Sequence, residues 1–526
     1  MVTIDRTVTR RYVADDGWQL PPLTELMADT GLLPDPAISP VVEGEPLRQQ
    51  LAATYFDTAD LRLASAGLTL RRRTGGDDAG WQLRVPAGAD ARSGVRLPLG
   101  RGARTVPVRL ERMVWAQTLG SALRPVAEIV TDRTVRRLVD VTGHVVAEVA
   151  DDRVTGRRLL PTDGPGDAAA AAASWREVGV ELGDADDDVR SAVDARMRDR
   201  GLSPAPDAPE PARVLELQPG EAAREGEGRA LTVRSPAGDA VLAHLREQVQ
   251  QVRRQDLPVR LDAQDAVHKM RVATRRLRSA LTTFKPLFDA EQAGRLREEL
   301  KWLAGELGAA RDAEVMRDRV STAVEAQADV VQGRPAAEVA DAELGEAYRT
   351  AHDRVLAELD GDRYHAVLVA LDGLVTSPPL TERAARRAGK VLPRQVARSY
   401  AKVRAIVAQA EATPPGAERE ELLHDARKAA KRSRYAGESV SQVFGKDAVV
   451  FAAAMEDVQE ALGEHQDSVL TRERLRDLAR HTSSTDAAFL YGRLHAQEEA
   501  GAGESQRHFD AAWKAAGRKR LHRWLR

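Results

Sequence analysis

The chain has 526 residues, which is too long for one ordinary hydrophobic core and predicts two or three domains. Hydrophobic residues make up 43% and charged residues 30% of the sequence, a balance typical of globular proteins, and the net charge of -2 hides local clusters of basic residues. The absence of cysteine excludes disulfides, zinc–thiolate sites and thiol nucleophiles. The N-terminus lacks a signal-peptide pattern, and no apolar stretch is long enough to cross a bilayer, so we expect a soluble cytoplasmic protein.

The first 200 residues have the pattern of short β-strands. Thr105–Val108, His144–Val149 and Val178–Leu182 are β-prone runs, and Gly, Pro and Asp separate them. Pro161–Ala173, rich in Gly and then in Ala, predicts a mobile loop. Residues 201–234 are rich in Pro, Glu and Gly, which predicts a linker between domains.

Residues 235–526 have the pattern of α-helices. Ala, Leu, Arg and Glu dominate, and apolar residues recur every three or four positions. The run Thr413–Gly416 interrupts this pattern near its middle, which predicts two parts of about 240–410 and 411–526. The recurring apolar positions include Leu296, Leu300, Leu303 and Leu307.

Two ordered motifs repeat within this helical half. His268–Arg278 and His424–Arg434 share the pattern His-x-x-Arg-x-x-x-(Arg/Lys)-Arg-x-Arg, and a Leu-Gly-x-x-x-Asp motif follows each copy, ending at Asp312 and at Asp467. The copies lie 156 residues apart for the first motif (424 − 268) and 155 for the second (462 − 307). The spacing predicts a duplicated helical bundle. We expect Asp312 and Asp467 to cap a helix or to pair with an Arg rather than to bind metal.

Each His-led motif forms a basic stripe when it is placed on a helix. At 100° per residue, every third or fourth residue of the motif falls on one side, while the apolar residues from Met270 to Phe284 fall on the opposite side. Residues 266–280 hold five Lys or Arg and no acid, and like charges at this spacing destabilise a helix unless an anion meets them. A solvated basic face, or ion pairs with Glu298, Glu299 and Glu306 of a neighbouring helix, is the alternative.

On these motifs, the helical half resembles the CHAD domain, the conserved-histidine α-helical family. The resemblance implies two pseudo-symmetric four-helix bundles that bind inorganic polyphosphate, whereas the residues alone support only a polyanion. No cofactor is expected for this half. The expected polyphosphate contacts are His268, Lys269, Arg271, Arg275, Arg276, Arg278, His424, Arg427, Lys428, Lys431, Arg432 and Arg434.

The N-terminal half resembles the CYTH domain on other runs of sequence. Tyr55–Leu61, Gly67–Arg73, Gly80–Pro86, Ala147–Val154 and Trp175–Leu182 carry this resemblance. It implies an antiparallel eight-stranded β-tunnel in which Arg and Lys surround a triphosphate and Glu surrounds a divalent metal, Mg²⁺ or Mn²⁺. The fold class expected for the whole chain is therefore α+β multidomain, with this tunnel followed by the duplicated all-α domain.

The basic half of the tunnel machinery is present, but the acidic half is depleted. Where the family opens with Glu-x-Glu-x-Lys, this chain has Thr7-Val-Thr-Arg-Arg11, and Gly94 and Gly179 stand where further glutamates are usual. Because hard cations need carboxylate oxygens, these losses weaken metal binding. The expected triphosphate ligands are Arg71, Arg73, Arg84, Arg133 and Arg137, and the remaining candidate metal ligands are Glu148, Asp152, Glu177 and Glu181.

These features predict a polyphosphate-binding protein, associated with polyphosphate granules, whose CYTH half is non-catalytic or weakly active, so no catalytic residue is assigned. The alternative is a metal-dependent triphosphatase, acting on inorganic triphosphate or on triphosphate-containing small molecules, that the CHAD half localises. Nucleic acid is a weaker candidate partner, because aromatic residues are only 4% of the chain and none lies in the first basic stripe.

Overall fold

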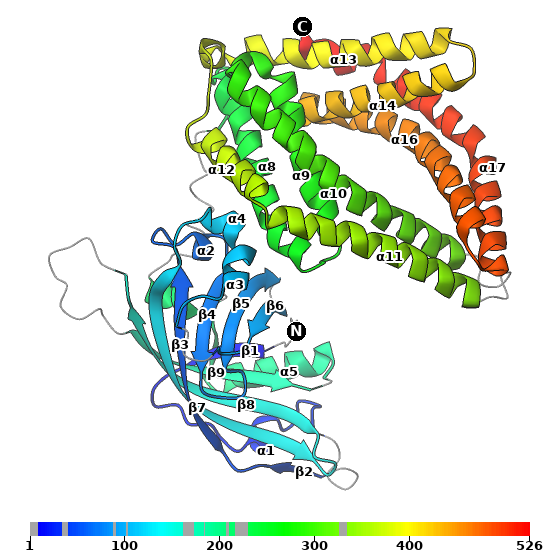
Figure 1. The fold of residues 1–526 in the computed structure, drawn as a ribbon. Helices are drawn as coiled ribbons and strands as arrows, with labels where there is room; N and C mark the ends of the chain where they lie inside the picture. The colour runs from blue at the N-terminus through cyan, green and yellow to red at the C-terminus, as the bar shows by residue number, and fades with distance from the viewer. Residues whose placement is uncertain are drawn as a thin grey trace. The chain divides into compact units, whose positions relative to one another are not determined.

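The computed structural model describes residues 9–33, 40–87, 91–100, 104–160, 173–183, 185–206, 210–215, 230–325 and 334–526. The chain divides into two compact units, Met1–Gly228 and Arg229–Arg526, and each is described by itself (Figure 1). Within those ranges, no helix is both long and apolar enough to span a bilayer.

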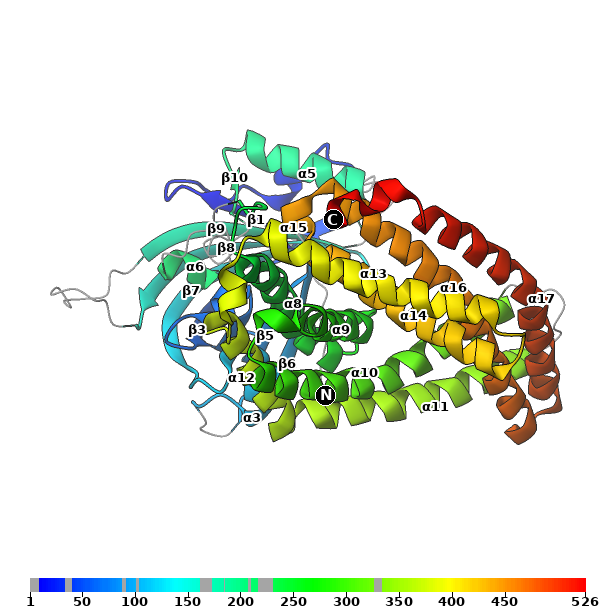
Figure 2. The same cartoon turned by 90° about the horizontal axis from the view of Figure 1, so that it is seen from above.

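The N-terminal unit is built on one antiparallel sheet. The strands follow the order β10-β1-β9-β8-β7-β3-β4-β5-β6, and β2 pairs with β7 (Figure 1; β10 is labelled in Figure 2). Eight strands are long, and β2 and β10 are short additions to the predicted eight. The described pairings form an open path from β10 to β6, whereas a closed tunnel would also join the two ends. The strands are β1 (Thr9–Ala14), β2 (Val41–Glu43), β3 (Leu47–Asp57), β4 (Thr69–Thr74), β5 (Gly80–Ala87), β6 (Ala91–Leu97), β7 (Arg124–Asp140), β8 (Val145–Arg158), β9 (Ala173–Leu182) and β10 (Ser203–Pro204).

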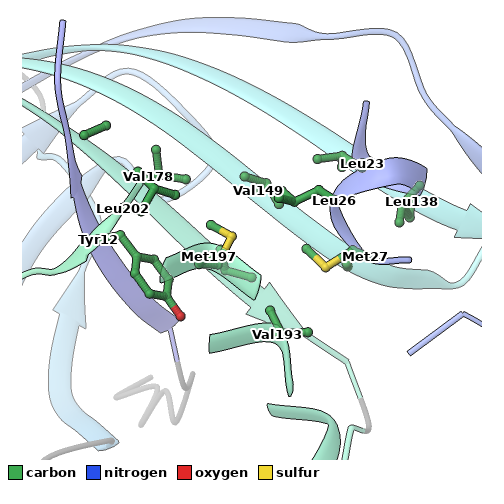
Figure 3. Close-up of a cluster of buried hydrophobic side chains, with 13 residues drawn as sticks. Tyr12, Leu23, Leu26, Met27, Leu138, Val149, Val178, Val193, Met197 and Leu202 are labelled. Carbon is green, nitrogen blue, oxygen red and sulfur yellow. The ribbon is translucent and has the colours of Figure 1, made fainter. Parts of the chain in front are cut away.

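One face of the sheet packs against helices. Alternate residues of β1, β8 and β9, such as Tyr12, Val149 and Val178, point to this face because successive strand side chains alternate. They pack with Val193 and Met197 of α5, as Figure 3 shows. The resulting core holds α1 and α5 on the sheet. The helices of this unit are α1 (Leu23–Leu26), α2 (Arg62–Ser65), α3 (Val108–Met113), α4 (Trp115–Thr118), α5 (Asp187–Asp199) and α6 (Glu210–Val214).

The opposite face of the sheet, called the inner face below, carries a second core that includes part of the expected linker. Val214 and Leu215 are buried with Ala53, Ile129 and other residues of β3 and β7. A Cβ atom at Gly156 of β8 would lie 2.3 Å from the Val214 side chain, so glycine makes room for α6. Residues 201–206 and 210–215 therefore belong to the folded N-terminal unit. Although this segment is rich in Pro, Leu202, Val214 and Leu215 are buried in the cores of the unit.

For this unit, one sequence expectation needs correction and another falls mostly on residues outside the description. Thr105–Val108 is not a strand, because Pro107 precedes α3 and Val108 is its first residue. Residues 161–172 of the expected loop lie outside the described residues, and Ala173 already belongs to β9. His144–Val149 and Val178–Leu182 were placed correctly, apart from His144, which precedes β8.

In its described residues, the second unit consists of α-helices and three short 3₁₀ segments joined by turns. Leu300, Leu303 and Leu307 are at most 1% exposed, which confirms the helical period read from the sequence. Figure 2 shows the green helices of the first repeat beside the yellow-to-red helices of the second. The elements are α8 (Ala237–Arg260), α9 (Ala266–Thr283), η1 (Lys285–Leu287), α10 (Ala290–Glu325), α11 (Arg334–Leu359), α12 (Asp362–Thr376), η2 (Glu382–Ala385), α13 (Ala388–Ala412), α14 (Ala417–Glu438), α15 (Ser441–Phe444), α16 (Lys446–His481), α17 (Thr485–Ala516) and η3 (Lys519–Leu525).

The two repeats match helix by helix. The packing series α8–α9–α10–α11 recurs as α13–α14–α16–α17. Hence α13 opens the second repeat, and the boundary lies before Ala388 rather than near residue 410. The break at Thr413–Gly416 is the turn between the first two helices of the second repeat, equivalent to the turn between α8 and α9.

The segment before α8 belongs to the helical unit. The Ala388 amide donates to the Ser235 carbonyl and the Gly389 amide to the Val233 carbonyl, so residues 233–235 are fixed on the start of α13. The expected linker of 201–234 is thus anchored at both ends. Residues 216–229, between these anchored parts, lie outside the description.

Candidate polyanion site

The two predicted basic helices, α9 and α14, pack against each other. The apolar back of α9 is buried as expected, since Met270, Leu277, Leu281 and Phe284 are each 0% exposed. The basic residues of α9 therefore lie on its other side. The two stripes converge between the repeats and form one shared site instead of two separate ones.

Four cations define the centre of this site, called the basic cluster below: Arg271 and Arg275 of α9, and Arg427 and Lys431 of α14. Burial and the charges of Arg275, Arg427 and other neighbouring arginines lower the pKa of Lys431 to about 7. Burial also lowers the pKa of Arg275, and the charges of Arg271 and Arg427 act in the same direction. The charges on each helix therefore disfavour the charged form of cations on the other, so the four cations lie within electrostatic range of one another.

Two other stripe residues join the helices through an acid. Arg276 of α9 lies 3.0 Å from a carboxylate oxygen of Glu438, and Arg434 of α14 lies 2.7 Å from the other oxygen. Both guanidinium groups also lie over the ring of Tyr435, at 5.7 and 5.8 Å. Arg434 further pairs with Glu456 at 2.8 Å. These two arginines are held and partly neutralised by the protein, which the basic pattern of the sequence did not predict.

The Leu-Gly-x-x-x-Asp motifs position the first arginine of each stripe. A Cβ atom at Gly308 would lie 3.5 Å from Arg271, and one at Gly463 would lie 2.9 Å from Arg427. Asp312 pairs with Arg271 at 3.1 Å, as one of the expected alternatives, whereas the Asp467 side chain lies outside the description. The glycine that both motifs repeat was the available signal for this role and was overlooked.

The remaining predicted contacts lie around the basic cluster. Desolvation and the charge of Arg311 lower the pKa of His268, so this ring gains its charge at a lower pH than usual. The Nδ1 atom of His424 is buried without a hydrogen-bond partner among the described residues. Lys428 pairs with Asp425 at 3.2 Å. Lys269 is exposed, and Arg278 and Arg432 are partly exposed.

Three glutamates of α10 pair with residues outside the basic stripes, although Asp312 of the same helix pairs with Arg271. Glu298 pairs with Lys301, Glu299 with Arg363 and Glu306 with Arg354. The alternative in which these glutamates serve as counter-ions to the first stripe is therefore wrong. The basic cluster is partly buried, so it is not an ordinary solvated face either.

The N-terminal unit gathers the predicted tunnel arginines on the inner face. Arg71 is 3% exposed, and it donates to Gln82 and to the Tyr55 hydroxyl at 3.0 and 3.1 Å. Arg73 is 8% exposed and pairs with Asp78. These two are buried residues rather than exposed strand arginines. Arg84 lies across from Gly94, and Arg96, opposite Gln82, shares this face but was missed by the sequence analysis.

Two further arginines lie opposite the candidate metal ligands. Arg133 makes a two-pronged ion pair with Asp152, at 2.8 and 2.7 Å, and Arg137 donates to Glu148 at 2.7 Å. Arg213 of α6 pairs with Glu177 at 3.0 Å. Glu181 lies directly across from Glu148 in the sheet. The arginines and acids expected to hold different parts of a metal–triphosphate complex thus pair with one another.

The described residues do not fit a divalent-cation centre. No group of three or more His, Asp or Glu side chains within the described ranges is arranged to hold a metal ion. In the sheet Thr9 lies across from Glu181 and Arg11 across from Gly179, and neither residue is a carboxylate. Thr7 lies outside the description. A side chain at Gly94 would meet the Leu83 carbonyl oxygen at 2.7 Å, so this backbone does not accommodate the usual glutamate.

Comparison with known proteins finds a family match in each half of the chain. A CYTH domain matches residues 43–186, and a CHAD domain matches residues 243–476. Two uncharacterized proteins of Mycobacterium tuberculosis, from strains CDC 1551 / Oshkosh and ATCC 25618 / H37Rv, are each 38% identical over 464 residues, which is 86% of this chain and 86% of theirs.

Two solved structures also resemble part of the chain. PptA from Streptomyces chartreusis is 24% identical, covers 53% of this chain and 100% of its own, and has a TM-score of 0.45. The CHAD domain from the plant Ricinus communis is 23% identical, covers 57% and 96%, and has a TM-score of 0.43. Since the domain matches and the Mycobacterium relatives extend over most of the sequence, the chain belongs to the family of proteins in which a CYTH domain is followed by a CHAD domain.

Proposed function

We propose that this protein binds inorganic polyphosphate, with the basic cluster between α9 and α14 as its principal contact. The observation that carries this proposal is the meeting of Arg271, Arg275, Arg427 and Lys431 from two helices at one partly buried place. Four gathered cations repel one another in the unbound protein. A linear anion with many charged oxygens relieves this repulsion at several cations at once.

The chemistry of the side chains suits phosphate. Arginine presents a planar fork of donors to two oxygens, while lysine supplies a mobile point charge. Gly308 and Gly463 leave space for the guanidinium groups of Arg271 and Arg427. The His424 ring has an unsatisfied buried nitrogen that can serve as a further donor, since imidazole can carry its proton on either nitrogen. The cluster therefore combines charge with hydrogen-bond donors.

This function has consequences for where the protein acts. A polymer longer than the cluster would extend beyond it, so one protein would occupy only part of a chain. We propose that the protein docks on polyphosphate chains or granules in the cytoplasm. The helical unit needs no cofactor in this scheme.

Binding should be measured with the purified full-length chain at two salt concentrations. The variant with Arg271, Arg275, Arg427 and Lys431 all changed to Ala is expected to lose at least 100-fold in affinity, which corresponds to about 2.7 kcal/mol. The salt dependence should also become shallower, because fewer counterions are released when fewer charges are neutralised. Unchanged affinity in this variant would rule out the basic cluster as the site.

A second candidate function is metal-dependent hydrolysis of a triphosphate by the CYTH unit. The burial of Arg71 and Arg73 on the inner face favours it, because buried cations suit a phosphate ligand. The pairing of Asp152, Glu148 and Glu177 with arginines opposes it, since a bound Mg²⁺ or Mn²⁺ would have to displace those arginines.

The test is phosphate release from inorganic triphosphate with Mg²⁺ or Mn²⁺. We expect little release, and none that depends on Arg71 and Arg73. Metal-dependent turnover that disappears in the Arg71→Ala/Arg73→Ala double variant would establish the second function instead.

A further inference from the structure

The outward face of α13 carries a row of cations that the basic cluster does not include. Lys390, Arg394, Arg398 and Lys402 are all exposed and recur at every fourth residue. At 1.5 Å per residue this row, called the α13 ladder, is about 18 Å long with a charge every 6 Å or so. None of the four forms an ion pair with a described carboxylate, and Arg398 donates only to the neutral amide of Gln395. Like charges at this spacing destabilise a helix. The presence of four of them therefore indicates that an anion binds along the ladder.

The architecture of the bundle does not require the ladder. Its counterpart α8 can be aligned by the helix starts, Ala237 and Ala388, an offset of 151 residues (388 − 237). The buried residues then coincide, for example Leu245 with Val396 and Val252 with Val403. At this offset the ladder positions in α8 hold Asp239, Ala243, Glu247 and Gln251, with two acids and no cation.

The end of the chain adds further cations beside α13. The segment η3 packs on α13 and α16, where the His522 ring stacks on Tyr400 at 4.3 Å. Figures 1 and 2 both show the C-terminus near α13. Residues 511–526 contain no acid, and their exposed cations are Lys514, Arg518, Lys519, Arg520, Arg523 and Arg526.

We infer that the α13 ladder and the basic chain end form a second polyphosphate-binding surface, separate from the basic cluster. The inference rests on the proposed function for the identity of the polymer. The ladder faces away from the bundle, because Leu392, Val396 and Val403 face inward. The cations of this surface lie in an exposed row, and polyphosphate is a linear polymer whose negative charges can follow that row.

Other polyanions fit this surface less well. Among the described residues, α13 and η3 contribute no exposed large hydrophobic side chain. A single-stranded nucleic acid would find no exposed aromatic ring on which to stack its bases. An anionic membrane would meet no apolar side chain to insert below its headgroups.

The test compares three variants of the full-length chain with the wild type. The ladder variant changes Lys390, Arg394, Arg398 and Lys402 to Gln, and the cluster variant is the four-alanine variant described above. A control variant with the same loss of charge changes four exposed cations that already pair with acids to Gln: Arg295, Lys301, Arg349 and Arg363. Calorimetric titration with a short polyphosphate at physiological salt gives the number of chains bound.

We expect two chains on the wild type and on the control variant, and one on the ladder variant and on the cluster variant. Two chains on the ladder variant, or equal losses in the ladder and control variants, would overturn the inference. A cluster variant that still binds two chains would contradict the proposed function, but it would not contradict binding of polyphosphate at the α13 ladder. In the cluster variant, a single-stranded oligonucleotide or phosphatidylserine vesicles that bind more tightly than polyphosphate would overturn the choice of ligand.

Discussion

At the scale of single residues, Lys431 links the charge of the site to pH. Its pKa is lowered to about 7 in the folded protein by burial and by the neighbouring arginines, so near neutral pH it is partly uncharged. A bound polyanion raises this pKa again. Binding should therefore take up protons, and affinity should fall as pH rises above 7.

Titration calorimetry in two buffers of different ionisation enthalpy measures this uptake. Lys431→Arg keeps the charge at every accessible pH, so it should keep high affinity and lose most of the pH dependence. An equally steep pH dependence in this variant would assign the proton to another group.

Lys431 should also lower the free energy of unfolding of the unbound protein. The charged form is penalised in the fold, so the unfolded chain binds more protons between pH 7 and the ordinary lysine pKa of about 10.4, and stability contributed by this group rises over that window. Lys431→Met should stabilise the unbound protein by roughly 1–3 kcal/mol at pH 7, less as pH approaches 10, and weaken polyphosphate binding. Denaturant unfolding at pH 7 and pH 9.5 checks this, and a destabilised Met variant at pH 7 would contradict it.

Gly463 offers a residue-scale test of how Arg427 is positioned. The Cβ of Gly463→Ala would lie 2.9 Å from the guanidinium, whose flexible side chain can move away, so the fold should survive while binding weakens several-fold. Gly305→Ala is the matched control, because nothing lies within 4 Å of its Cβ. An exposed helical Gly→Ala change should stabilise the protein by about 0.5–1 kcal/mol. Equal affinities for the two variants would show that the glycine has no positioning role.

At the scale of elements, Glu438 joins α9 to α14. It holds Arg276 and Arg434 beside the basic cluster, so it stabilises the helix pair while it reduces the positive charge that a polyanion meets. Glu438→Gln should therefore lower stability by about 1 kcal/mol and raise polyphosphate affinity. Glu299→Gln, which removes an acid paired with Arg363 elsewhere, is the control. Weaker binding in Glu438→Gln alone would mean that the acid positions the arginines more than it competes with the ligand.

The elements also show what the sequence could and could not predict. Periodicity placed the apolar back of α9 correctly, because the position of a side chain on a helix depends on spacing alone. The repeated His-led motif predicted a duplication. The meeting of the two stripes was not predictable in this way, since it depends on how α9 and α14 pack between repeats. Glu438 follows the second motif and was not considered, although its i, i+4 spacing from Arg434 was visible.

In the CYTH half, the resemblance predicted that the arginines and acids surround one site, and the strand register places them on one face of the sheet. It did not predict that they pair with one another, because pairing depends on which residues lie opposite across the strands. Arg133 meets Asp152, and Arg137 meets Glu148, through the register of β7 and β8. The end of this domain was also misjudged, since Val214 and Leu215 are buried in a segment whose composition is typical of linkers.

At the scale of the whole molecule, the two units have separate cores and separate charged sites. All contacts of the basic cluster described above come from residues of the second unit, and the inner-face ion pairs come from the first. A protein consisting of residues 229–526 should therefore bind polyphosphate with an affinity within about threefold of the full chain, a difference below 0.7 kcal/mol. Residues 229–235 must be kept, because Val233 and Ser235 pair with the start of α13. A shorter form that begins at Ala237 should be less stable. If the 229–526 form keeps its helical circular dichroism but loses more than tenfold in polyphosphate affinity, the CYTH unit contributes directly to binding.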